Sequence, residues 1–204
     1  MSEVYIHLGL PRTGSTFLQR NVFPKLDLHY VSKPGTVSGG KFIDVRGKEG
    51  KFLFSNENWS GWLYKETSNE RYAMLQWFKE RYPDAHIMLC TRDTDAWLKS
   101  IKNNQWKKEP NYDLEQYDRQ MLDTDTYVKT INTLFKGNLI FDYDEFKKDN
   151  KAMVGKMCKW LDVPLPSDIS YKIVNQSWSK QQVQLAHFIK KLKKYSFERI
   201  LGGI

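Results

Sequence analysis

The residues from Gly9 to Thr16 have the types and the spacing of a loop that binds phosphate. The run Gly-Leu-Pro-Arg-Thr-Gly-Ser-Thr follows a short apolar stretch and precedes a helical pattern, with the glycine spacing G-x-x-x-x-G. Backbone amides in such a turn, together with the positive end of the following helix, attract an anion. The alternative is a purely structural turn between a strand and a helix, and the spacing favours the phosphate site.

The cation of this loop stands in an unusual place. Loops that bind nucleoside triphosphates carry a lysine directly after the second glycine, where it reaches the β and γ phosphates. This chain has Ser15 there, and its cation is Arg12, two residues before Gly14. A cation inside the loop lies beside the terminal group of a shorter anhydride, while the amides of residues 13–17 hold the adjacent phosphate. The loop therefore predicts phosphate binding without predicting a triphosphate.

A second arginine follows another apolar stretch. Arg92 comes directly after the strand-like run 87–91, and Ser100 lies eight residues later in a helical pattern. An arginine offers a charged fork of donors and a serine adds a hydroxyl, so both can bind one phosphate. The alternative is that Asp93 caps the helix while Arg92 forms a surface ion pair. The phosphate loop upstream in the chain favours the phosphate site.

Alternating strands and helices must position these residues. Strand-like runs occur at 4–8, 28–31, 52–55, 87–91 and 139–143. Helical patterns cover 15–22, 74–81 before Pro83, the apolar positions between 114 and 134, and 153–161 before Pro164. This alternation predicts an α/β fold, one domain over residues 1–204 with three layers, α/β/α, around a central parallel sheet of about five strands. Ligands bind at the carboxyl ends of such strands, so the site belongs in the loops that follow them.

The bulk composition limits the class of protein and of partner. The chain has 204 residues, 40% hydrophobic and 27% charged, and no apolar run approaches the ~20 residues of a membrane span. No signal-peptide pattern opens it, so we expect a soluble, cytoplasmic protein. The formal charge of +8 favours an anionic partner, whether nucleic acid, membrane surface, nucleotide or acidic glycan.

Cysteines and histidines are few and scattered. We expect two reduced, buried thiols rather than a disulfide or a metal pair, and no metal site; the residues concerned are Cys90, Cys158, His7, His29, His86 and His187.

The loop and its flanks carry a resemblance to a known family. Residues 6–19, Ile-His-Leu-Gly-Leu-Pro-Arg-Thr-Gly-Ser-Thr-Phe-Leu-Gln, resemble the 5′-phosphosulfate loop of the sulfotransferases that use PAPS (3′-phosphoadenosine 5′-phosphosulfate), whose usual form is Pro-Lys-Thr/Ser-Gly-Thr-Thr. Arg12 stands where the family has lysine, and an arginine is a planar fork where a lysine is a point charge. The resemblance implies a P-loop-like fold and assigns these residues to the donor site: Pro11, Arg12, Thr13, Gly14, Ser15, Thr16 and Phe17.

Two further passages are similar to the same family. Arg92 and Ser100 resemble its 3′-phosphate element, which distinguishes PAPS and its product PAP (adenosine 3′,5′-bisphosphate) from ATP and ADP. Residues 139–164 are similar to its Tyr-Glu-Asp-Leu and Leu-Gly-Val-Pro passages, whereas its C-terminal Arg-Lys-Gly gate is not found, and residues 174–178 stand in its place. The resemblance therefore implies PAPS as donor and no metal.

The candidate catalytic residues are a cation and a base. Arg12 is expected to neutralise the leaving phosphate oxygen. Glu57 follows the strand-like run 52–55, at a place where related sulfotransferases often carry Ser-x-Glu, and it is our candidate base. The alternative for Glu57 is a helix cap or loop carboxylate. His29 is the second candidate base, and His7 is expected to be structural.

The expected reaction moves the sulfuryl group of PAPS to a hydroxyl or amine of an acceptor, a glycan or an aromatic or alcohol small molecule. The tryptophans suit stacking on such an acceptor, although core packing also explains them: Trp59, Trp62, Trp97, Trp106 and Trp178. The segment 32–51 is expected to be a lid over the site or a plain connection. The lysines of the predicted basic helix 181–195 are expected to form its solvent-exposed face. Alternative functions are a non-catalytic phosphate-loop domain that binds polyanions or nucleic acid, and a nucleotide kinase, which the missing lysine disfavours.

Overall fold

The computed structural model describes residues 2–32, 42–61, 68–106, 119–172, 181–182, 184–185 and 187–189. The chain forms two compact units. The first unit comprises residues 1–93 and 117–174, and the second comprises 94–116 and 175–204. The second unit contains helix α3 (Thr94–Trp106), and the sheet lies in the first unit. Much of the segment 32–51, together with residues 174–178, falls outside the described residues.

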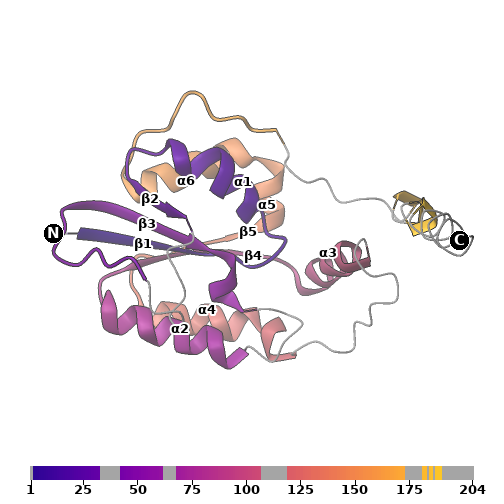
Figure 1. Ribbon diagram of the computed structural model, residues 1–204, viewed down its shortest axis with the longest axis horizontal. Coiled ribbons are helices and arrows are strands. Elements are labelled where there is room, and N and C mark those ends of the chain that lie inside the picture. The colour runs from indigo at the N-terminus through magenta and orange to yellow at the C-terminus, as the bar shows by residue number, and fades with distance from the viewer. Residues whose placement is uncertain are drawn as a thin grey trace, which may run out of the picture. The chain divides into compact units, whose positions relative to one another are not determined.

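A parallel sheet of five strands forms the centre of the first unit (Figure 1). The strands are β1 (Ser2–Leu8), β2 (His29–Ser32), β3 (Gly50–Asn56), β4 (His86–Thr91) and β5 (Leu139–Asp142). Their order is β2-β3-β1-β4-β5, and each neighbouring pair is parallel. Leu8 at the end of β1 lies opposite Asn56 in β3 and Leu89 in β4. The predicted α/β fold is confirmed, and the loops after β1, β3 and β4 meet at one edge.

Helices cover both faces of this sheet (Figure 1). On one face lie α1 (Ser15–Phe17), α5 (Tyr143–Lys148) and α6 (Asn150–Leu161), and on the other lie α2 (Ser68–Arg81) and α4 (Thr124–Leu134). The helix expected over 15–22 changes type, because α1 continues as a π-helical turn (Leu18–Val22) and a 3-10 turn (Phe23–Lys25). Two more 3-10 turns are η4 (Glu57–Ser60) and η6 (Arg119–Leu122).

Aspartates begin three of the helices. The carboxylates of Asp142, Asp149 and Asp123 accept backbone N–H bonds of 2.8, 2.8 and 2.9 Å at the starts of α5, α6 and α4. Such caps satisfy N–H groups that the helix itself leaves without a partner. Helix α6 ends at Asp162, whose φ of 50° is left-handed, two residues before Pro164. Local sequence therefore sets where these helices start and stop.

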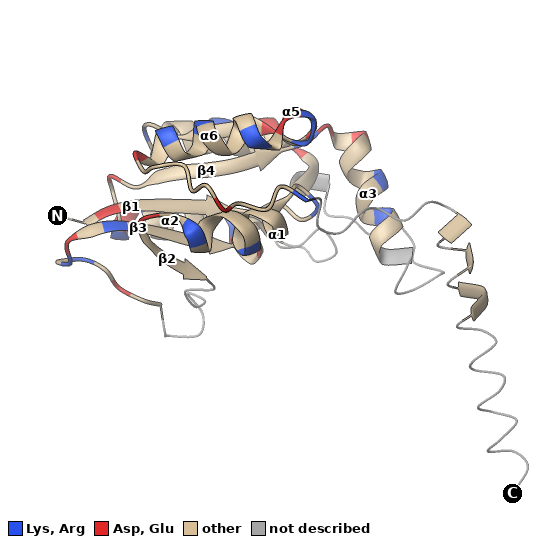
Figure 2. Cartoon of the chain, turned by 90° about the horizontal axis from the view of Figure 1, so that it is seen from above, with Lys and Arg blue, Asp and Glu red and all other residues tan. Residues whose placement is uncertain are grey.

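Apolar packing holds the helices against the sheet. Helix α6 buries one face, and Figure 2 shows its lysines spaced along the helix among uncharged residues. The core on that side of the sheet includes Tyr5, Phe17, Leu18, Phe23, Met88, Phe141, Phe146, Val154, Met157 and Leu161. Cys90 and Cys158 are both buried free thiols in the same core. In the described part of the chain, no helix is long and apolar enough to cross a membrane.

Candidate active site

The phosphate loop follows β1 with a strained backbone. Arg12 has a φ of 67° and Gly14 a φ of 86°, both in the left-handed region. A glycine adopts this conformation readily, whereas an arginine pays a conformational cost that its surroundings must offset. A Cβ atom on Gly14 would lie 2.7 Å from Cε1 of Phe146, so the aromatic ring also requires a glycine here. The loop therefore keeps its shape through both backbone and packing.

Two buried hydroxyls lie inside this loop. The Thr13 hydroxyl donates to the carbonyl oxygen of Leu10 at 2.7 Å, and Ser15 is 2% exposed at the start of α1. The backbone approaches Ser15 closely, since a Cβ on Gly9 would lie 2.6 Å from the Ser15 Oγ. The glycine spacing seen in the sequence thus serves a tight turn around the serine hydroxyl.

Glu57 reaches this loop from the neighbouring strand. It is the first residue of η4, directly after β3, and Asn56 caps that turn by accepting the N–H of Asn58 at 3.0 Å. Ser15 and Glu57 both lie against Gly9, since a Cβ placed there would be 2.6 Å from the Ser15 Oγ and 3.0 Å from the Glu57 Cγ. The Ser15 hydroxyl donates to the carbonyl oxygen of Leu10 at 3.5 Å. Burial raises the pKa of Glu57 above its usual value, and the serine and arginine partly offset that rise. Arg12, Ser15 and Glu57 therefore come together at the carboxyl edge of the sheet.

Arg92 reaches the loop from the other side, directly after β4. Its Nη1 donates to the carbonyl oxygen of Arg12 at 3.1 Å, and its guanidinium lies 4.5 Å from the ring centre of Tyr143. The Nε atom of Arg92 is buried and has no hydrogen-bond partner among the described residues. Ser100 is a buried residue of α3, in the second unit.

Tyr143 and Phe146 are residues of this edge that the motifs did not single out. Tyr143 packs on the Arg92 guanidinium, and Phe146 lies against both Gly14 and Phe17, with ring centres 5.8 Å apart in the second pair. Both residues follow β5 at its carboxyl end, and that position is the signal in the sequence by which they could have been found. Their aromatic rings pack against the phosphate loop and against Arg92.

The histidines lie away from this arrangement. His7 is fully buried in β1, where its Nδ1 is 2.8 Å from the Ser55 Oγ, and burial lowers its pKa to about 3. Such a group is a weak general base. His29 begins β2 and stacks on Phe52 with ring centres 4.8 Å apart, so it lies toward the amino edge of the sheet. In the described ranges, no three His, Cys, Asp or Glu side chains gather as a metal site needs.

The profile of the sulfotransferase family matches residues 44–167, which is more than half of the chain. This chain belongs to the sulfotransferase family. It is therefore an enzyme, a transferase. The matched residues include Glu57, Arg92 and Ser100, and they begin after the phosphate loop.

Solved structures share the fold of this sulfotransferase. A sulfotransferase from Alicyclobacillus acidocaldarius is 15% identical with a TM-score of 0.51, over 84% of this chain and 85% of that chain. The sulfotransferase domain from the curacin biosynthetic pathway is 11% identical with a TM-score of 0.52, over 93% and 86%. No curated protein sequence matches the chain. At these identities the structural likeness supports the fold, and the site must be argued from the residues themselves.

The five tryptophans considered for stacking on an acceptor lie either in the core or outside the part of the chain whose side chains are described. Trp59 is 2% exposed and packs edge-on against Phe78 with ring centres 4.9 Å apart, so core packing explains it. Trp97 is also buried. The side chains of Trp62, Trp106 and Trp178 lie outside the described residues. Because it is buried, Trp59 does not offer a surface on which an acceptor could stack.

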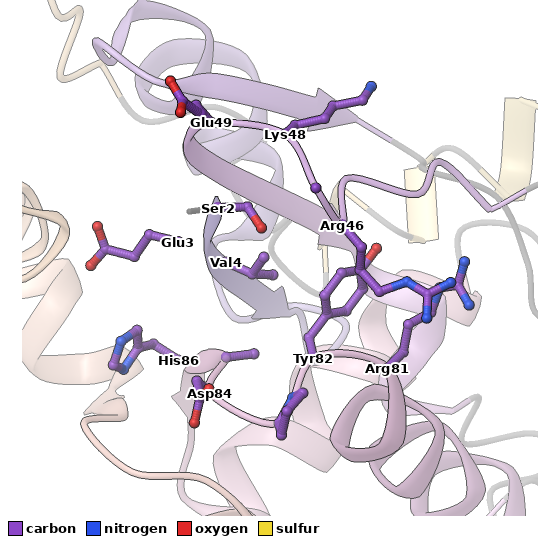
Figure 3. A pocket seen from close by; sticks show the side chains of 13 residues that line it. Ser2, Glu3, Val4, Arg46, Lys48, Glu49, Arg81, Tyr82, Asp84 and His86 are labelled. Atoms are coloured by element: carbon purple, nitrogen blue, oxygen red, sulfur yellow. The ribbon is translucent and has the colours of Figure 1, made fainter.

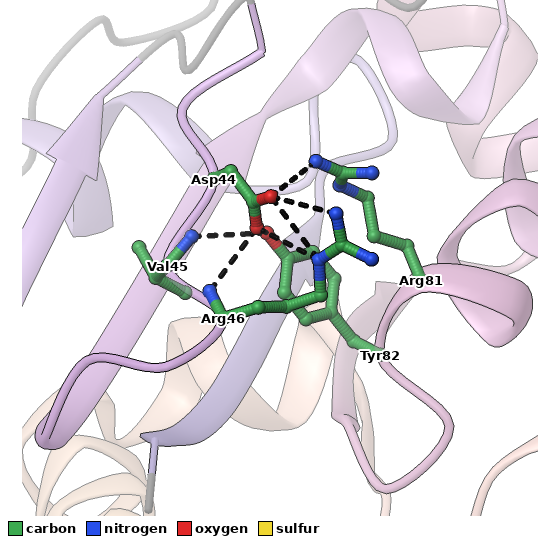
Figure 4. Close-up of polar contacts among 5 residues, drawn as sticks. All are labelled: Asp44, Val45, Arg46, Arg81 and Tyr82. Carbon is green, nitrogen blue, oxygen red and sulfur yellow. Dashed lines mark hydrogen bonds and ion pairs between the residues drawn. The ribbon is translucent and has the colours of Figure 1, made fainter.

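A second hollow of about 700 Å³ lies at the opposite, amino edge of the sheet (Figure 3). Charges of both signs line it, including Glu3, Arg46, Arg81 and Asp84. Beside it the Asp44 carboxylate accepts hydrogen bonds from Arg46, Arg81 and Tyr82 (Figure 4). At this edge Arg46 and Arg81 are both paired with Asp44.

Proposed function

We propose that this sulfotransferase takes the sulfuryl group of PAPS and transfers it to a hydroxyl or amine, with Glu57 as base and Arg12 as the cation on the leaving oxygen. The observation that supports the proposal is that Ser15 of the phosphate loop and Glu57 lie next to each other against Gly9, at the carboxyl edge of the sheet. Loops after two neighbouring parallel strands supply them, which is where α/β sheets bind their ligands.

The shape of the loop fits a phosphosulfate group. The tight turns at Gly9 and Gly14 let backbone approach a ligand closely, and a Cβ at either position would collide with a neighbour. In this proposal residues 11–17 hold the 5′ end of the donor. Arg92 is proposed to hold the 3′-phosphate, since its buried Nε has no partner among the described residues and its Nη1 donates to the loop backbone.

Each catalytic side chain has a defined task in the transfer. The acceptor oxygen or nitrogen forms a bond to sulfur as the bond from sulfur to the phosphate oxygen breaks. Glu57 takes the proton that the acceptor loses, and its raised pKa suits that task. Arg12 stabilises the negative charge that grows on the departing phosphate oxygen. The donor supplies the activated sulfuryl group, and positioning by the loop supplies much of the remaining rate enhancement.

Calorimetry with PAP and with ADP tests the donor. PAP is expected to bind in the micromolar range and ADP far more weakly, because ADP lacks the 3′-phosphate. Arg92→Ala should weaken PAP binding by about 10- to 100-fold, as expected for loss of a charged hydrogen bond. Arg46→Ala, at the amino edge, is the matched control and should leave the affinity unchanged. Equal affinities for PAP and ADP would rule out the assigned 3′-phosphate site.

A transfer screen tests the chemistry and identifies the acceptor. Labelled PAPS is offered with glycans, phenols, aliphatic alcohols and amines, and the expected result is label on at least one acceptor class. Arg12→Ala should abolish that label, and Arg46→Ala should retain it.

A further inference from the structure

Three polar side chains meet on one hydroxyl close to the proposed active site. The Nε2 atom of Gln19 donates to the Ser55 Oγ at 2.9 Å, and the Nδ1 atom of His7 lies 2.8 Å from the same oxygen. Ser55 and His7 are fully buried, and Gln19 is half-buried. Gln19 belongs to the π-helical turn after the phosphate loop, Ser55 to β3 and His7 to β1. One hydroxyl therefore joins three elements that lead to the site.

The same segments carry the pair Ser15 and Glu57, which meet against Gly9. Ser55 precedes Glu57 by two residues, and the residue between them is extended, so both side chains leave the chain on one side. Gln19 follows Ser15 by four residues in a helical segment, which also puts both side chains on one face. Four helical residues and two strand residues each span roughly 6 Å, so the two contacts are in step. The bond between Gln19 and Ser55 therefore sets the separation of the two segments.

His7 indicates that this group does more than fill space. Its Nε2 atom is buried and has no hydrogen-bond partner among the described residues. An unsatisfied buried nitrogen costs stability, and an apolar side chain of similar size would avoid that cost. The imidazole packs edge-on against Phe23, with ring centres 5.1 Å apart, which fixes the direction from which Nδ1 meets Ser55. The histidine thus holds the serine hydroxyl in place for Gln19.

The phosphate loop has supports of its own. The Thr13 hydroxyl donates to the carbonyl oxygen of Leu10 at 2.7 Å. The Phe146 ring packs closely against Gly14. These contacts do not depend on Ser55, so loss of its bond to the π-helical turn should displace the end of β3 without reshaping the loop.

We propose that Gln19 and Ser55 are positioning residues of the transfer reaction, and that they act by setting the distance between Glu57 and the phosphate loop. The inference rests on the proposed function, in which Glu57 takes the proton of the acceptor while the loop holds the donor. Base and donor site follow different strands, β3 and β1, so their spacing depends on contacts between the two segments. A misplacement of about 1 Å at a reacting group costs about 100-fold in rate. The bond thus controls the rate of transfer without touching either substrate.

Kinetics of labelled sulfuryl transfer, combined with calorimetry with PAP, tests the inference. Gln19→Leu keeps the size of the side chain and removes its amide. It is expected to lower kcat by about 10- to 100-fold and to leave the Kd for PAP within about 3-fold of the wild-type value. Ser55→Ala should give the same split. The double variant should lose no more than either single variant, because both changes break one bond.

Asn21→Leu is the matched control. Its side-chain amide lies on the same π-helical turn but donates to the carbonyl oxygen of Ser170 at 3.1 Å. This change should lower the urea midpoint about as much as Gln19→Leu does, and kcat should stay at the wild-type value.

Four results would overturn the inference alone: wild-type kcat in Gln19→Leu, an equal loss of kcat in Asn21→Leu, additive losses in the double variant, or equal losses of kcat and PAP affinity. A wild-type protein that transfers no sulfuryl group from PAPS would instead overturn the proposed function, and the inference with it.

Discussion

The arginines at the two edges of the central sheet have different kinds of partner. At the amino edge, Arg46 and Arg81 both donate to the carboxylate of Asp44, and these arginines hold the pKa of that carboxyl well below its usual range. At the carboxyl edge, Arg92 donates to a backbone carbonyl and packs on an aromatic ring. Among the described residues it has no carboxylate partner.

The phosphate loop combines a strained backbone with an unsatisfied polar atom nearby. The loop at the carboxyl edge holds Arg12 in a left-handed conformation, and the adjacent Arg92 keeps a buried nitrogen without a partner in the described structure. Strain and unsatisfied polar atoms persist where the surrounding structure supports them, and they concentrate at functional sites. At the carboxyl edge both features lie beside the phosphate loop, which supports a ligand site there, whereas the unsatisfied Nε of Arg81 at the amino edge belongs to an arginine that is paired with Asp44.

The largest expected effect is on catalysis at the carboxyl edge. Glu57→Gln should lower the rate of sulfuryl transfer by about 10²- to 10⁴-fold, since a general base contributes that much. The wild-type rate should fall as pH falls through the raised pKa of Glu57, because protonation removes the base, and the variant should lack this acidic limb. Labelled transfer assayed across pH checks both effects, and full activity of the variant would place the base elsewhere.

The next effect is on the stability of the phosphate loop. Gly14→Ala should destabilise the protein by about 2–4 kcal/mol, because it combines a left-handed alanine with a clash against Phe146. The control is Gly155→Ala in α6, where an added Cβ meets nothing within 4 Å and should stabilise the helix by about 0.5–1 kcal/mol. Urea denaturation measures both, and equal midpoints would show that the loop conformation is not a constraint.

A third effect is the acid sensitivity of the buried histidine. Folded His7 stays neutral down to about pH 3, whereas an unfolded histidine takes up a proton below about pH 6.5. The free energy of unfolding should therefore decrease as the pH is lowered through this window. His7 alone should account for a decrease of about 2 kcal/mol between pH 7 and pH 5. His7→Gln should flatten the pH dependence of the urea midpoint, and His29→Gln, on exposed β2, should not. Identical slopes for His7→Gln and wild type would contradict the assignment.

The smallest effect is expected at the amino edge. Asp44→Asn weakens the pairing with Arg46 and Arg81 and should cost about 1 kcal/mol or less, because the carboxylate is 35% exposed and water screens the pairs. PAP affinity should stay at the wild-type value. A large loss of PAP binding in this variant would remove the functional distinction between the two edges.

The elements of the fold were predictable because each carries its own local signal. Five apolar runs predicted five strands; β3 is longer than predicted by two residues at its start and one at its end, and β5 begins as predicted and ends one residue earlier. The helix after the phosphate loop was harder, since its spacing is helical but its hydrogen bonds switch from α to π type at Leu18. The helical spacing of the sequence does not predict that switch.

The sequence by itself determined the residue types of the site and their place after parallel strands. Glycine spacing, a displaced cation and a glutamate after β3 are all visible in it, because each depends on neighbours close along the chain. Only the tertiary structure decided which of them touch. Residues 12, 15 and 57 meet because β1 and β3 are adjacent and in register at Leu8 and Asn56, and such pairing across 48 residues depends on how the whole sheet packs.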